Sequence, residues 1–315
     1  MDALVGHTGF VGSNLLRQHD FAARFNSANL AGIAGRSFDT LVVSSAPAAM
    51  WQANQAPEAD WAGLEAQLAL IGRARARRVV LISTIAVLRD PAAGPDETST
   101  DYEEATPYGR HRRAFEEAIA ARFPTHLILR LPALFGHGLK KNFLFDLRNP
   151  VPTFLRPEAW DELQGRLPAA EAELLSRAFR RDGETGLWLF DRAGHGAGET
   201  GARIAAILGA AGISTIAFTH ADSRFQFYPL ARLWSDIETA FAGGLSVLNL
   251  ATEPLTAGEV HRAVLGREMT ARSAARITQD MRTRHAALWG REGPYLAGRA
   301  EILAAIGRFM AEGAA

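Results

Sequence analysis

The chain has 315 residues, 48% of them hydrophobic and 22% charged, which is typical of a soluble globular protein with one large domain or two modest lobes. Its 34 basic and 34 acidic residues cancel, so no basic excess favours binding to a nucleic-acid backbone. The sequence contains no cysteine, which excludes disulfides, thiolate nucleophiles and thiolate metal sites and fits a reducing compartment.

The first half alternates short apolar runs with helical stretches. We predict helices at 10–18, 58–78 and 108–123, and strands at 3–6, 39–47, 78–84 and 126–136. Continuous apolar strands that alternate with helices are typical of a parallel sheet covered on both faces. The sequence therefore predicts an α/β fold with a doubly wound parallel sheet, although residues 20–38 are too irregular to assign.

The pattern changes after Gly136. Amphipathic helical stretches follow, with a further helix at 228–244 and further strands in "GISTIAFTH" and at 244–254. We predict that residues 1–139 form a dinucleotide-binding domain of the Rossmann type, to which the chain returns around 214–252. Residues 140–213 and 253–315 are then expected to form a smaller, mostly helical substrate-binding lobe.

The first strand leads into the glycine turn "GHTGFVG". Gly6 allows a tight turn, Gly9 lets the backbone approach a diphosphate, and Gly12 permits close packing of the following helix. The start of that helix offers free N–H groups to phosphates. We predict a dinucleotide site that also includes Thr8, Phe10 and Val11; the alternative is a tight turn without a ligand.

The choice of cofactor stays open between NAD and NADP. An acidic residue about 20 positions after the turn normally accepts the ribose hydroxyls of NAD. The sequence there is "FAARFNSANLAG", which offers Asn26 and Ser27 and no carboxylate. Neutral residues do not repel a 2′-phosphate, and Arg24 or Arg36 could pair with one. Ala46, at the end of the predicted strand at 39–47, is a further expected cofactor contact.

Polar side chains end the predicted strand at 78–84 and begin the helix at 108–123. Ser83 and Thr84 come at the carboxyl end of the strand, where ligands bind in open α/β sheets. Tyr108 opens the helix, with Thr106 as the expected N-cap and Pro107 at the first helical position.

Together, these features resemble the extended short-chain dehydrogenase/reductase superfamily, the NAD-dependent epimerase/dehydratase group that acts mostly on nucleotide sugars. The segments that carry the resemblance cover most of the chain. They are "GHTGFVGSNL", "DTLVVSSAP", "VVLISTIAVL", the Tyr108 helix, "LILRLPALFGHG", "KKNFLFDL", "SRFQFYPLARLWSDI" and "LSVLNLATEPLT".

The resemblance implies three catalytic residues: Thr84, with Ser83 as second choice, Tyr108 and Arg112. In the family the tyrosine moves a proton to or from the substrate while a hydride passes to or from the nicotinamide. The phenol needs a nearby positive charge to lower its pKa from about 10. The family has lysine where this chain has Arg112, and arginine is bulkier and does not relay a proton. Either the mechanism tolerates this change or the redox chemistry is lost.

The resemblance also implies where a substrate would bind. The backbone at Pro132 would lie near the nicotinamide. Ser83 would contact the substrate, as would Asn142 at a helix start. Arg224 would pair with the diphosphate of a nucleotide sugar, a two-point contact that suits a guanidinium. Gln226 and Tyr228 follow at strand spacing and could line the same wall. The alternatives are simple strand termination at "LPALFG" and a surface arginine at 224.

The predicted function is therefore that of an NAD(P)-dependent oxidoreductase, epimerase or dehydratase of nucleotide sugars. The alternative is a catalytically silent NAD(P)-binding sensor or interaction protein of the same fold, which the change at Arg112 motivates. We expect no metal site, because the nine histidines lack ligand spacing, and no G-x-S-x-G elbow is present.

We also expect a cytoplasmic protein that binds neither nucleic acid nor membrane. No secretory signal follows Met1, and no run of about 18 apolar residues occurs. Relatives often dimerise through helices that include the tyrosine helix. Phe115, Ile119 and the helix at 58–78 would permit a homodimer of this kind.

Overall fold

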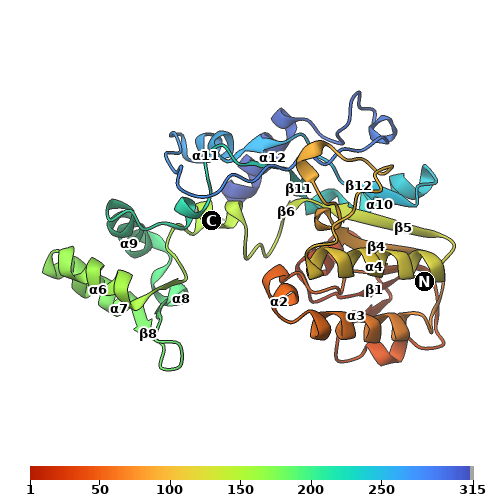
Figure 1. Cartoon of the computed structure of the whole chain (residues 1–315), viewed down its shortest axis with the longest axis horizontal. Coiled ribbons are helices and arrows are strands. Elements are labelled where there is room, and N and C mark those ends of the chain that lie inside the picture. The colour runs from red at the N-terminus through yellow and green to blue at the C-terminus, as the bar shows by residue number, and fades with distance from the viewer. Residues whose placement is uncertain (313–315) are drawn as a thin grey trace. The chain divides into compact units, whose positions relative to one another are not determined.

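The computed structural model describes residues 1–312, and the chain divides into two compact units (Figure 1). Unit 1 comprises Met1–Leu139, Arg224–Thr256 and the chain from Thr278 onward. Unit 2 comprises Lys140–Ser223 and Ala257–Ile277. The sequence-based division also ended the first domain at residue 139, but it placed residues 253–315 in the smaller lobe.

The chain from Thr278 onward belongs to unit 1 because its contacts are there. The amide of Gln279 donates to the carbonyl of Arg224, and the amide of Met281 donates to Gln226. The return to unit 1 begins at Arg224 rather than around residue 214. The expected strand in "GISTIAFTH" is a short 3-10 helix of unit 2, Thr215–Phe218, because the hydroxyl of Ser214 caps it by accepting the amide of Ile216.

Unit 1 is built on a six-stranded sheet whose paired strands all run parallel. Its order is β12-β5-β4-β3-β1-β2. The strands are β1 (Ala3–Val5), β2 (Ala23–Phe25), β3 (Ser37–Val43), β4 (Arg75–Thr84), β5 (His126–Leu131) and β12 (Val247–Asn249). This is the predicted doubly wound α/β architecture.

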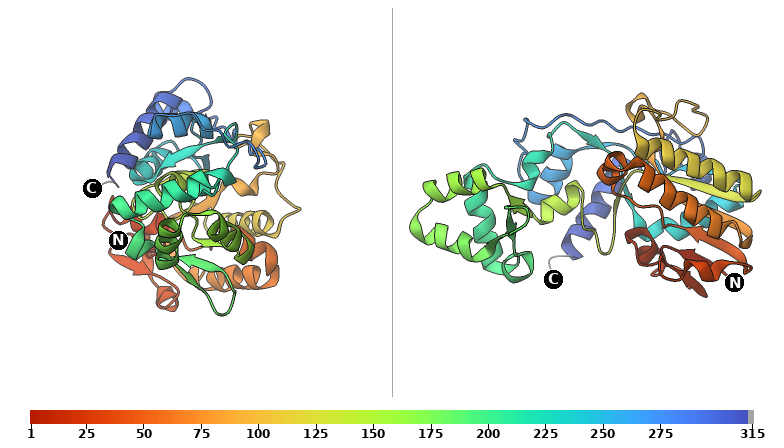
Figure 2. Two further views of the ribbon diagram at one scale, coloured as in Figure 1. Left: turned by 90° about the vertical axis from the view of Figure 1, so that its left-hand side faces the viewer. Right: turned by 60° about the horizontal axis from the view of Figure 1, so that its bottom comes forward.

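Helices cover both faces of this sheet, because alternate residues of each strand are apolar on either side. On one face, Leu64 and Ile71 of α3 and Phe115 and Ile119 of α4 are buried against the strands, and the two helices lie side by side in Figure 2. On the other face, α1 and α10 contribute a second buried cluster. The helices of unit 1 are α1 (Phe10–Leu15), α2 (Met50–Gln55), α3 (Pro57–Ile71), α4 (Pro107–Arg122), α10 (Leu233–Ala242) and α12 (Arg299–Glu312).

Several element boundaries differ from the prediction. The expected helix at 58–78 ends at Ile71, and β4 begins at Arg75, earlier than predicted. The expected strand at 126–136 is interrupted at Pro132, which has no N–H to donate to a sheet. The chain beyond it, β6 (Ala133–Phe135), pairs instead with β11 (Phe227–Pro229).

Short elements complete unit 1. Residues 20–38, which the sequence left unassigned, contain β2 and the 3-10 helix Leu30–Ile33. The remaining short elements are β10 (Arg224–Phe225), which pairs with β13 (Leu255–Thr256), and the 3-10 helices Ile85–Val87, Pro91–Ala93, Leu230–Arg232 and Ala286–Trp289.

Unit 2 packs helices around a small antiparallel sheet of order β7-β9-β8 (Figures 1 and 2). Trp160 stacks on Trp188 with ring centroids 4.2 Å apart at the centre of its apolar core. Its elements are α5 (Phe143–Arg148), β7 (Phe154–Leu155), α6 (Pro157–Arg166), α7 (Ala169–Ala178), β8 (Phe179–Arg181), β9 (Trp188–Phe190), α8 (Arg192–His195), α9 (Gly198–Ala210) and α11 (Ala257–Leu265).

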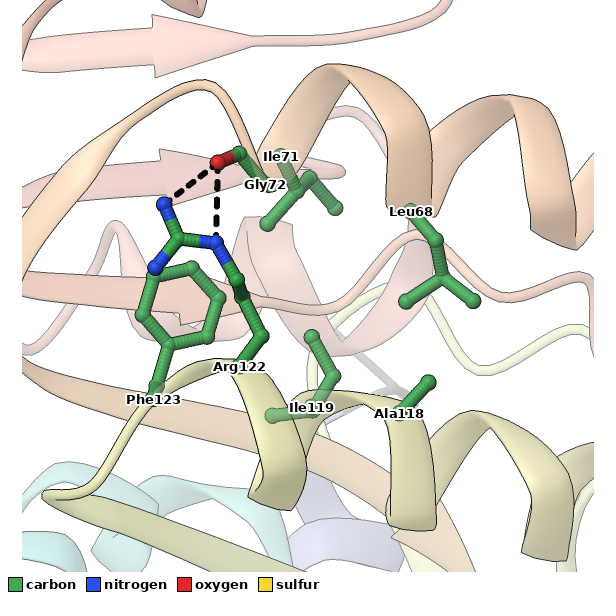
Figure 3. Close-up of a pocket in the computed structure, with 7 residues that line it drawn as sticks. All are labelled: Leu68, Ile71, Gly72, Ala118, Ile119, Arg122 and Phe123. Carbon is green, nitrogen blue, oxygen red and sulfur yellow. Dashed lines mark hydrogen bonds between the residues drawn. The ribbon is translucent and has the colours of Figure 1, made fainter.

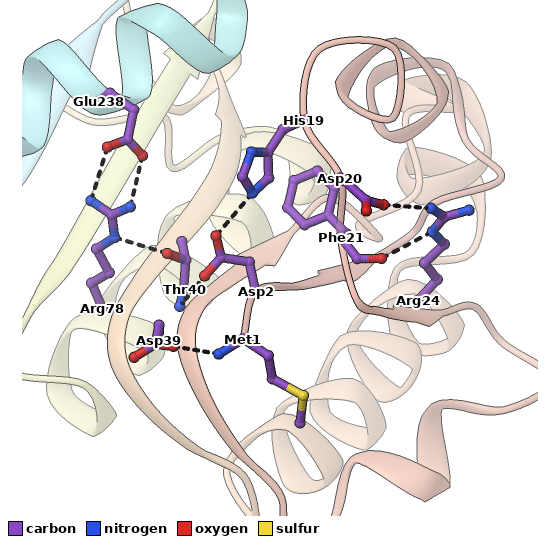
Figure 4. A network of polar contacts seen from close by, with 10 residues as sticks. All are labelled: Met1, Asp2, His19, Asp20, Phe21, Arg24, Asp39, Thr40, Arg78 and Glu238. Carbon is purple, nitrogen blue, oxygen red and sulfur yellow. Dashed lines mark hydrogen bonds and ion pairs between the residues drawn. The ribbon is translucent and has the colours of Figure 1, made fainter.

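A network of polar contacts links the residues before β1 to β3, β4 and α10 (Figure 4). Asp2 accepts a hydrogen bond from the amide of Thr40 and pairs with His19. Arg78 donates to the hydroxyl of Thr40 and forms an ion pair with Glu238 of α10. These side chains are therefore used in holding the fold. The carboxyl edge, where the predicted site residues come, is the opposite edge.

Candidate functional site

The glycine turn follows β1 at the carboxyl edge of the sheet. Gly6 has a φ of +87°, and a Cβ there would lie 2.3 Å from the carbonyl oxygen of Ser44. A Cβ on Gly12 would lie 2.1 Å from the carbonyl oxygen of Gly6. A Cβ on Gly9 would meet only the Gly6 oxygen, at 3.3 Å. Glycine is thus required at 6 and 12 for the backbone itself, while the exposed side of Gly9 leaves room for a ligand such as a diphosphate.

The other predicted residues of the turn differ in their burial. Thr8 is exposed, whereas Phe10 and Val11 are partly buried and pack against the apolar cluster on the α1 face of the sheet. Their side chains are therefore used in packing. Ala46, after β3, is likewise partly buried and packs against the cluster under α3 and α4.

Asn26 and Ser27 come directly after β2, as the sequence predicts. The side chain of Asn26 accepts the amide of Ala28, and Ser27 is exposed. Of the two arginines considered for a 2′-phosphate, Arg24 pairs with Asp20 (Figure 4). Arg36 precedes β3, and its guanidinium carbon lies 5.3 Å from the ring centroid of Phe25, the last residue of β2 before Asn26. The choice between NADP and NAD therefore stays open.

Asn14 is a site-supporting residue that the sequence analysis did not single out. It is buried in α1, and its Nδ2 donates to the carbonyl of His137 while its Oδ1 accepts the amide of His137. This pair of bonds joins the helix of the glycine turn to the loop after β6. Its position inside "GSNL" was the available signal, since a polar residue on the buried side of a short helix needs a partner.

Thr84 and Ser83 end β4 but have different partners. Thr84 lies within hydrogen-bonding reach of the Tyr108 phenol, and its Oγ1 also accepts the amide of Ala86. Ser83 instead donates a 2.6 Å hydrogen bond to the carboxylate of Glu116. Thr84 is therefore the residue that the structure brings beside the tyrosine.

Tyr108 occupies the first turn of α4, after Pro107. Thr106 is at the N-cap position of α4, as expected, but its side chain makes no capping hydrogen bond. The side-chain oxygen of Asn54 in α2 accepts the amide of Tyr108 instead. The tyrosine is 7% exposed, and the guanidinium carbon of Arg112 lies 4.4 Å from its ring centroid. The three residues expected to act together, Thr84, Tyr108 and Arg112, thus lie together.

The guanidinium of Arg112 is already bound by the protein. Its two terminal nitrogens donate to the two carboxylate oxygens of Asp60, at 2.8 and 2.9 Å, and one also donates to the carbonyl of Pro47 at 2.7 Å. His111 lies 2.9 Å from the same carboxylate. Burial alone would raise the pKa of Asp60, but the hydrogen bonds from Arg112 and His111 hold it below its usual range.

The surroundings of Tyr108 do not favour the phenolate that would act as a base. Burial raises the pKa of the phenol above its usual 10.0, and the positive charge of Arg112 offsets this effect only in part. The phenol therefore does not meet the condition for a base, a pKa lowered toward neutrality, because its burial outweighs the charge of Arg112; the negative charge of Asp60 adds a smaller rise.

A buried charged cluster supports the same edge of the sheet. Glu116 of α4 accepts hydrogen bonds from Ser83, Arg113 and Arg130, and both Glu116 and Arg130 are almost fully buried. The ring of Tyr102 lies 3.9 Å from the guanidinium carbon of Arg113. The sequence analysis missed this cluster, although a charged residue inside the apolar run "LILRL" was a visible signal.

Gln226 and Tyr228, which were expected to line the substrate site, are both buried in the core. Gln226 is fully buried, and its amide binds the carbonyls of Thr252 and Met281 and accepts the amide of Met281. Tyr228 is also fully buried, with its hydroxyl on Asp236. Neither side chain is free to contact a substrate, so their expected role is wrong. A strand alternates its faces, and here that face belongs to the core.

Other expected substrate contacts remain compatible with their role. Arg224 in β10 is exposed. Pro132 is buried between β5 and β6. Asn142 belongs to unit 2, where its Oδ1 accepts the amides of Leu144 and Phe145 and so caps α5, with a φ of +97°.

A hollow between α3 and α4 lies away from these residues (Figure 3). It is lined by Leu68, Ile71, Gly72, Ala118, Ile119, Arg122 and Phe123. Arg122 closes one end by donating to the carbonyl of Gly72, about 20 Å along α4 from Tyr108. Phe115 and Ile119 are buried against the sheet, so they offer no surface to a second copy, and the homodimer stays a prediction.

Residues 1–312 lack two further features. No helix there is long and apolar enough to cross a membrane. No group of three or more histidine, aspartate and glutamate side chains is placed to hold a metal ion.

No protein-family model matches the sequence, and no curated protein matches it significantly. Many solved structures share its fold. The UDP-N-acetylglucosamine 4-epimerase of Methanobrevibacter ruminantium, in complex with UDP-N-acetylmuramic acid, is 12% identical with a TM-score of 0.60, over 98% of this chain and 96% of that one.

Two further structures match at a similar level. The human epimerase family protein SDR39U1 with NADPH is 16% identical with a TM-score of 0.59, over 99% of each chain. MoeE5 in complex with UDP-glucose and NAD is 15% identical with a TM-score of 0.58, over 100% and 99% of the two chains. The chain therefore has the fold of the extended short-chain dehydrogenase/reductase proteins.

Proposed function

We propose that the chain is an NAD(P)-dependent enzyme that acts on a nucleotide sugar, with Tyr108 as the group that moves the proton. The observation that carries the proposal is the joint presence, at the carboxyl edge of one parallel sheet, of the glycine turn and the Thr84–Tyr108–Arg112 group. Ligands of open α/β sheets bind at this edge.

The structural neighbours support the class of ligand. They include complexes with UDP-glucose and NAD, with UDP-N-acetylmuramic acid and with NADPH. A bound dinucleotide would place its diphosphate on the turn at Gly6, Gly9 and Gly12 and its adenosine ribose near Asn26 and Ser27. We assign Ala46 and Pro132 to its other half. When bound, the dinucleotide donates or accepts the hydride of the reaction.

The chain's own residues then act on the proton and the substrate. The hydroxyls of Tyr108 and Thr84 would both hydrogen-bond the reacting oxygen of the sugar, and Tyr108 would exchange a proton with it. The guanidinium of Arg112 packs on the ring of Tyr108 and holds it in place. Arg224 is exposed and would pair with the diphosphate of the nucleotide sugar. Asn142 is a further proposed substrate contact.

A second candidate function is a catalytically silent NAD(P)-binding protein of the same fold. The ion pair between Arg112 and Asp60 favours it, because this guanidinium is already engaged and does not relay a proton as the lysine that the family resemblance implies here would. This protein would bind the dinucleotide without transferring hydride to any nucleotide sugar.

The test is calorimetric titration of the purified protein, freed of carried-over nucleotide, with NAD(H) and NADP(H), followed by a turnover screen with UDP- and dTDP-sugars. The proposed enzyme binds one dinucleotide and turns over a sugar nucleotide, and Tyr108→Phe abolishes turnover without weakening dinucleotide binding. Tyr295→Phe, which removes a phenol bound to Asp280, is the matched control and leaves turnover unchanged. Binding without turnover supports the silent protein, and no binding of either dinucleotide contradicts both.

A further inference from the structure

The carboxylate of Asp60 in α3 binds two side chains of α4. It receives both terminal nitrogens of Arg112 and lies against the ring nitrogen of His111. The side chains of Asp60 and Arg112 are only 6% and 4% exposed, so water screens the ion pair weakly. A full negative charge therefore stands at contact distance from the positive charge that faces Tyr108.

The charged groups around Tyr108 are few. Arg112 and His111 come from α4 itself and Asp60 from α3, and Glu103 of the preceding loop packs beside Gly109 in the next position of the helix. The other elements at this end of α4 are α2, the 3-10 helix Ile85–Val87 and the end of β4, and they present no charged side chain. Arg112 is thus the permanent cation beside the phenol, and Asp60 is its counter-charge.

We propose that Asp60 is a positioning residue, whose carboxylate holds the guanidinium of Arg112 against the ring of Tyr108 and opposes the effect of its charge on the phenol. Together with the burial of the phenol, this counter-charge keeps Tyr108 protonated through neutral pH. The cation beside the phenol is therefore an ion-paired one rather than a free one.

The consequence for turnover rests on the function proposed above. A protonated phenol suits the reduction of a carbonyl. The carbonyl carbon gains a hydride from a reduced nicotinamide dinucleotide, the C=O π bond breaks, and its oxygen takes the proton of Tyr108. Water then returns a proton to the phenolate. The reverse oxidation needs the phenolate at the start and is expected only at high pH.

The protonation of Tyr108 can be measured on the protein without any ligand. Tyrosine labelled with ¹³C at Cζ gives one NMR signal for each of the four tyrosines, and Tyr108→Phe identifies the relevant one. In the wild-type protein the Tyr108 signal is expected to titrate above 10.0. Asp60→Asn keeps the side-chain size and one acceptor oxygen but removes the charge. It is expected to lower the midpoint, because the charge that opposes Arg112 is removed.

Two further variants make the test specific. Asp60→Asn combined with Arg112→Gln removes both charges and is expected to return the midpoint toward the wild-type value. Glu58→Gln, on the exposed face at the start of α3, is the matched control and leaves it unchanged. A folded Asp60→Asn protein with an unaltered Tyr108 titration overturns the proposal, as does a wild-type Tyr108 that titrates near neutral pH.

If Asp60→Asn does not fold, Arg112→Gln alone carries the test. It leaves the Asp60 charge facing the phenol, so the midpoint is expected to rise, and an unchanged midpoint overturns the proposal. All of these readings come from the protein without dinucleotide or substrate. A protein that binds no dinucleotide would therefore contradict the proposed function and leave this result standing.

Discussion

Arg130 of β5 and Glu116 of α4 form a two-point ion pair in which both side chains are almost completely buried. The pair joins the strand to the tyrosine helix directly below the residues of the candidate site. Breaking a buried pair leaves an uncompensated charge, so Glu116→Gln is expected to lower the free energy of unfolding by about 3–5 kcal/mol.

Urea denaturation followed by circular dichroism measures this loss. Glu117→Gln, one residue further on and exposed on the same helix, is the control and is expected to cost less than about 1 kcal/mol. Equal effects of the two substitutions would contradict the structural role assigned to Glu116.

The glycine turn yields a second prediction that separates fold from ligand binding. Gly12→Ala drives a Cβ to 2.1 Å from the carbonyl oxygen of Gly6 and is expected to destabilise the fold. Gly9→Ala meets only a 3.3 Å contact, and Gly9 has a φ of −75° that alanine adopts easily. It is therefore expected to keep its thermal stability and to lose about tenfold or more in dinucleotide affinity.

Calorimetric titration and thermal unfolding of the same preparations test the two parts together. Gly32→Ala, at a position with open space around the added methyl group, is the control and changes neither quantity. A Gly9→Ala protein that binds the dinucleotide as tightly as the wild type would show that the turn does not cradle a diphosphate.

The fold was predictable because its signals are local. Most strands of the parallel sheet contain a short apolar run, with β2 as the exception, and the glycine triplet follows the first strand at the spacing that a strand–turn–helix unit needs. The boundaries were less predictable. The charged run "RARR" extends β4 because its side chains find partners, such as Glu238 for Arg78, far away in the sequence.

The residues of the candidate site could be predicted from the sequence, but the charges that surround them could not. Thr84, Tyr108 and Arg112 followed from spacing and from the resemblance to a family. The Asp60 counter-charge comes from another helix, and no periodicity shows which acidic residue of α3 meets Arg112. Gln226 was assigned to the substrate site for a similar reason. Sequence spacing shows which residues share one face of a strand, but it does not show what packs against that face.

Gln226 and its neighbour Arg224 provide a matched pair of substitutions. Gln226→Ala removes three buried hydrogen bonds and is expected to lower the free energy of unfolding by about 2–4 kcal/mol. Arg224→Ala removes an exposed side chain and is expected to leave stability within about 0.5 kcal/mol. In the proposed enzyme, Arg224→Ala raises KM for the sugar nucleotide about tenfold or more, because a charge-assisted contact to the diphosphate is lost.

Denaturation and steady-state kinetics of the two variants distinguish these roles. A Gln226→Ala protein of normal stability with a raised KM would restore Gln226 as a substrate contact. If the Arg224→Ala protein had an unchanged KM, Arg224 would not belong to the proposed site. The rest of the proposed function would still be tested by Tyr108→Phe.

Asp146 gives unit 2 a predicted dependence on pH. Burial raises the pKa of its carboxyl from 3.8 to about 6, and the positive charge of Arg192 opposes this only in part. The folded state therefore takes up a proton at a higher pH than the unfolded state, whose carboxyl titrates near 3.8. Between about pH 4 and 6 the folded state binds more protons, so its stability is expected to fall as the pH rises through this range.

Asp146→Asn removes the titrating group and is expected to raise the stability at pH 7.5 while flattening the dependence between pH 4 and 6. Thermal unfolding followed through tryptophan fluorescence includes this unit, because two of the six tryptophans, Trp160 and Trp188, lie in its core. Asp161→Asn in α6 is the control, since that carboxyl is exposed, and it should preserve the wild-type slope. If the Asp146→Asn protein kept the same slope as the wild type, the carboxyl of Asp146 would not be the buried acid of this unit.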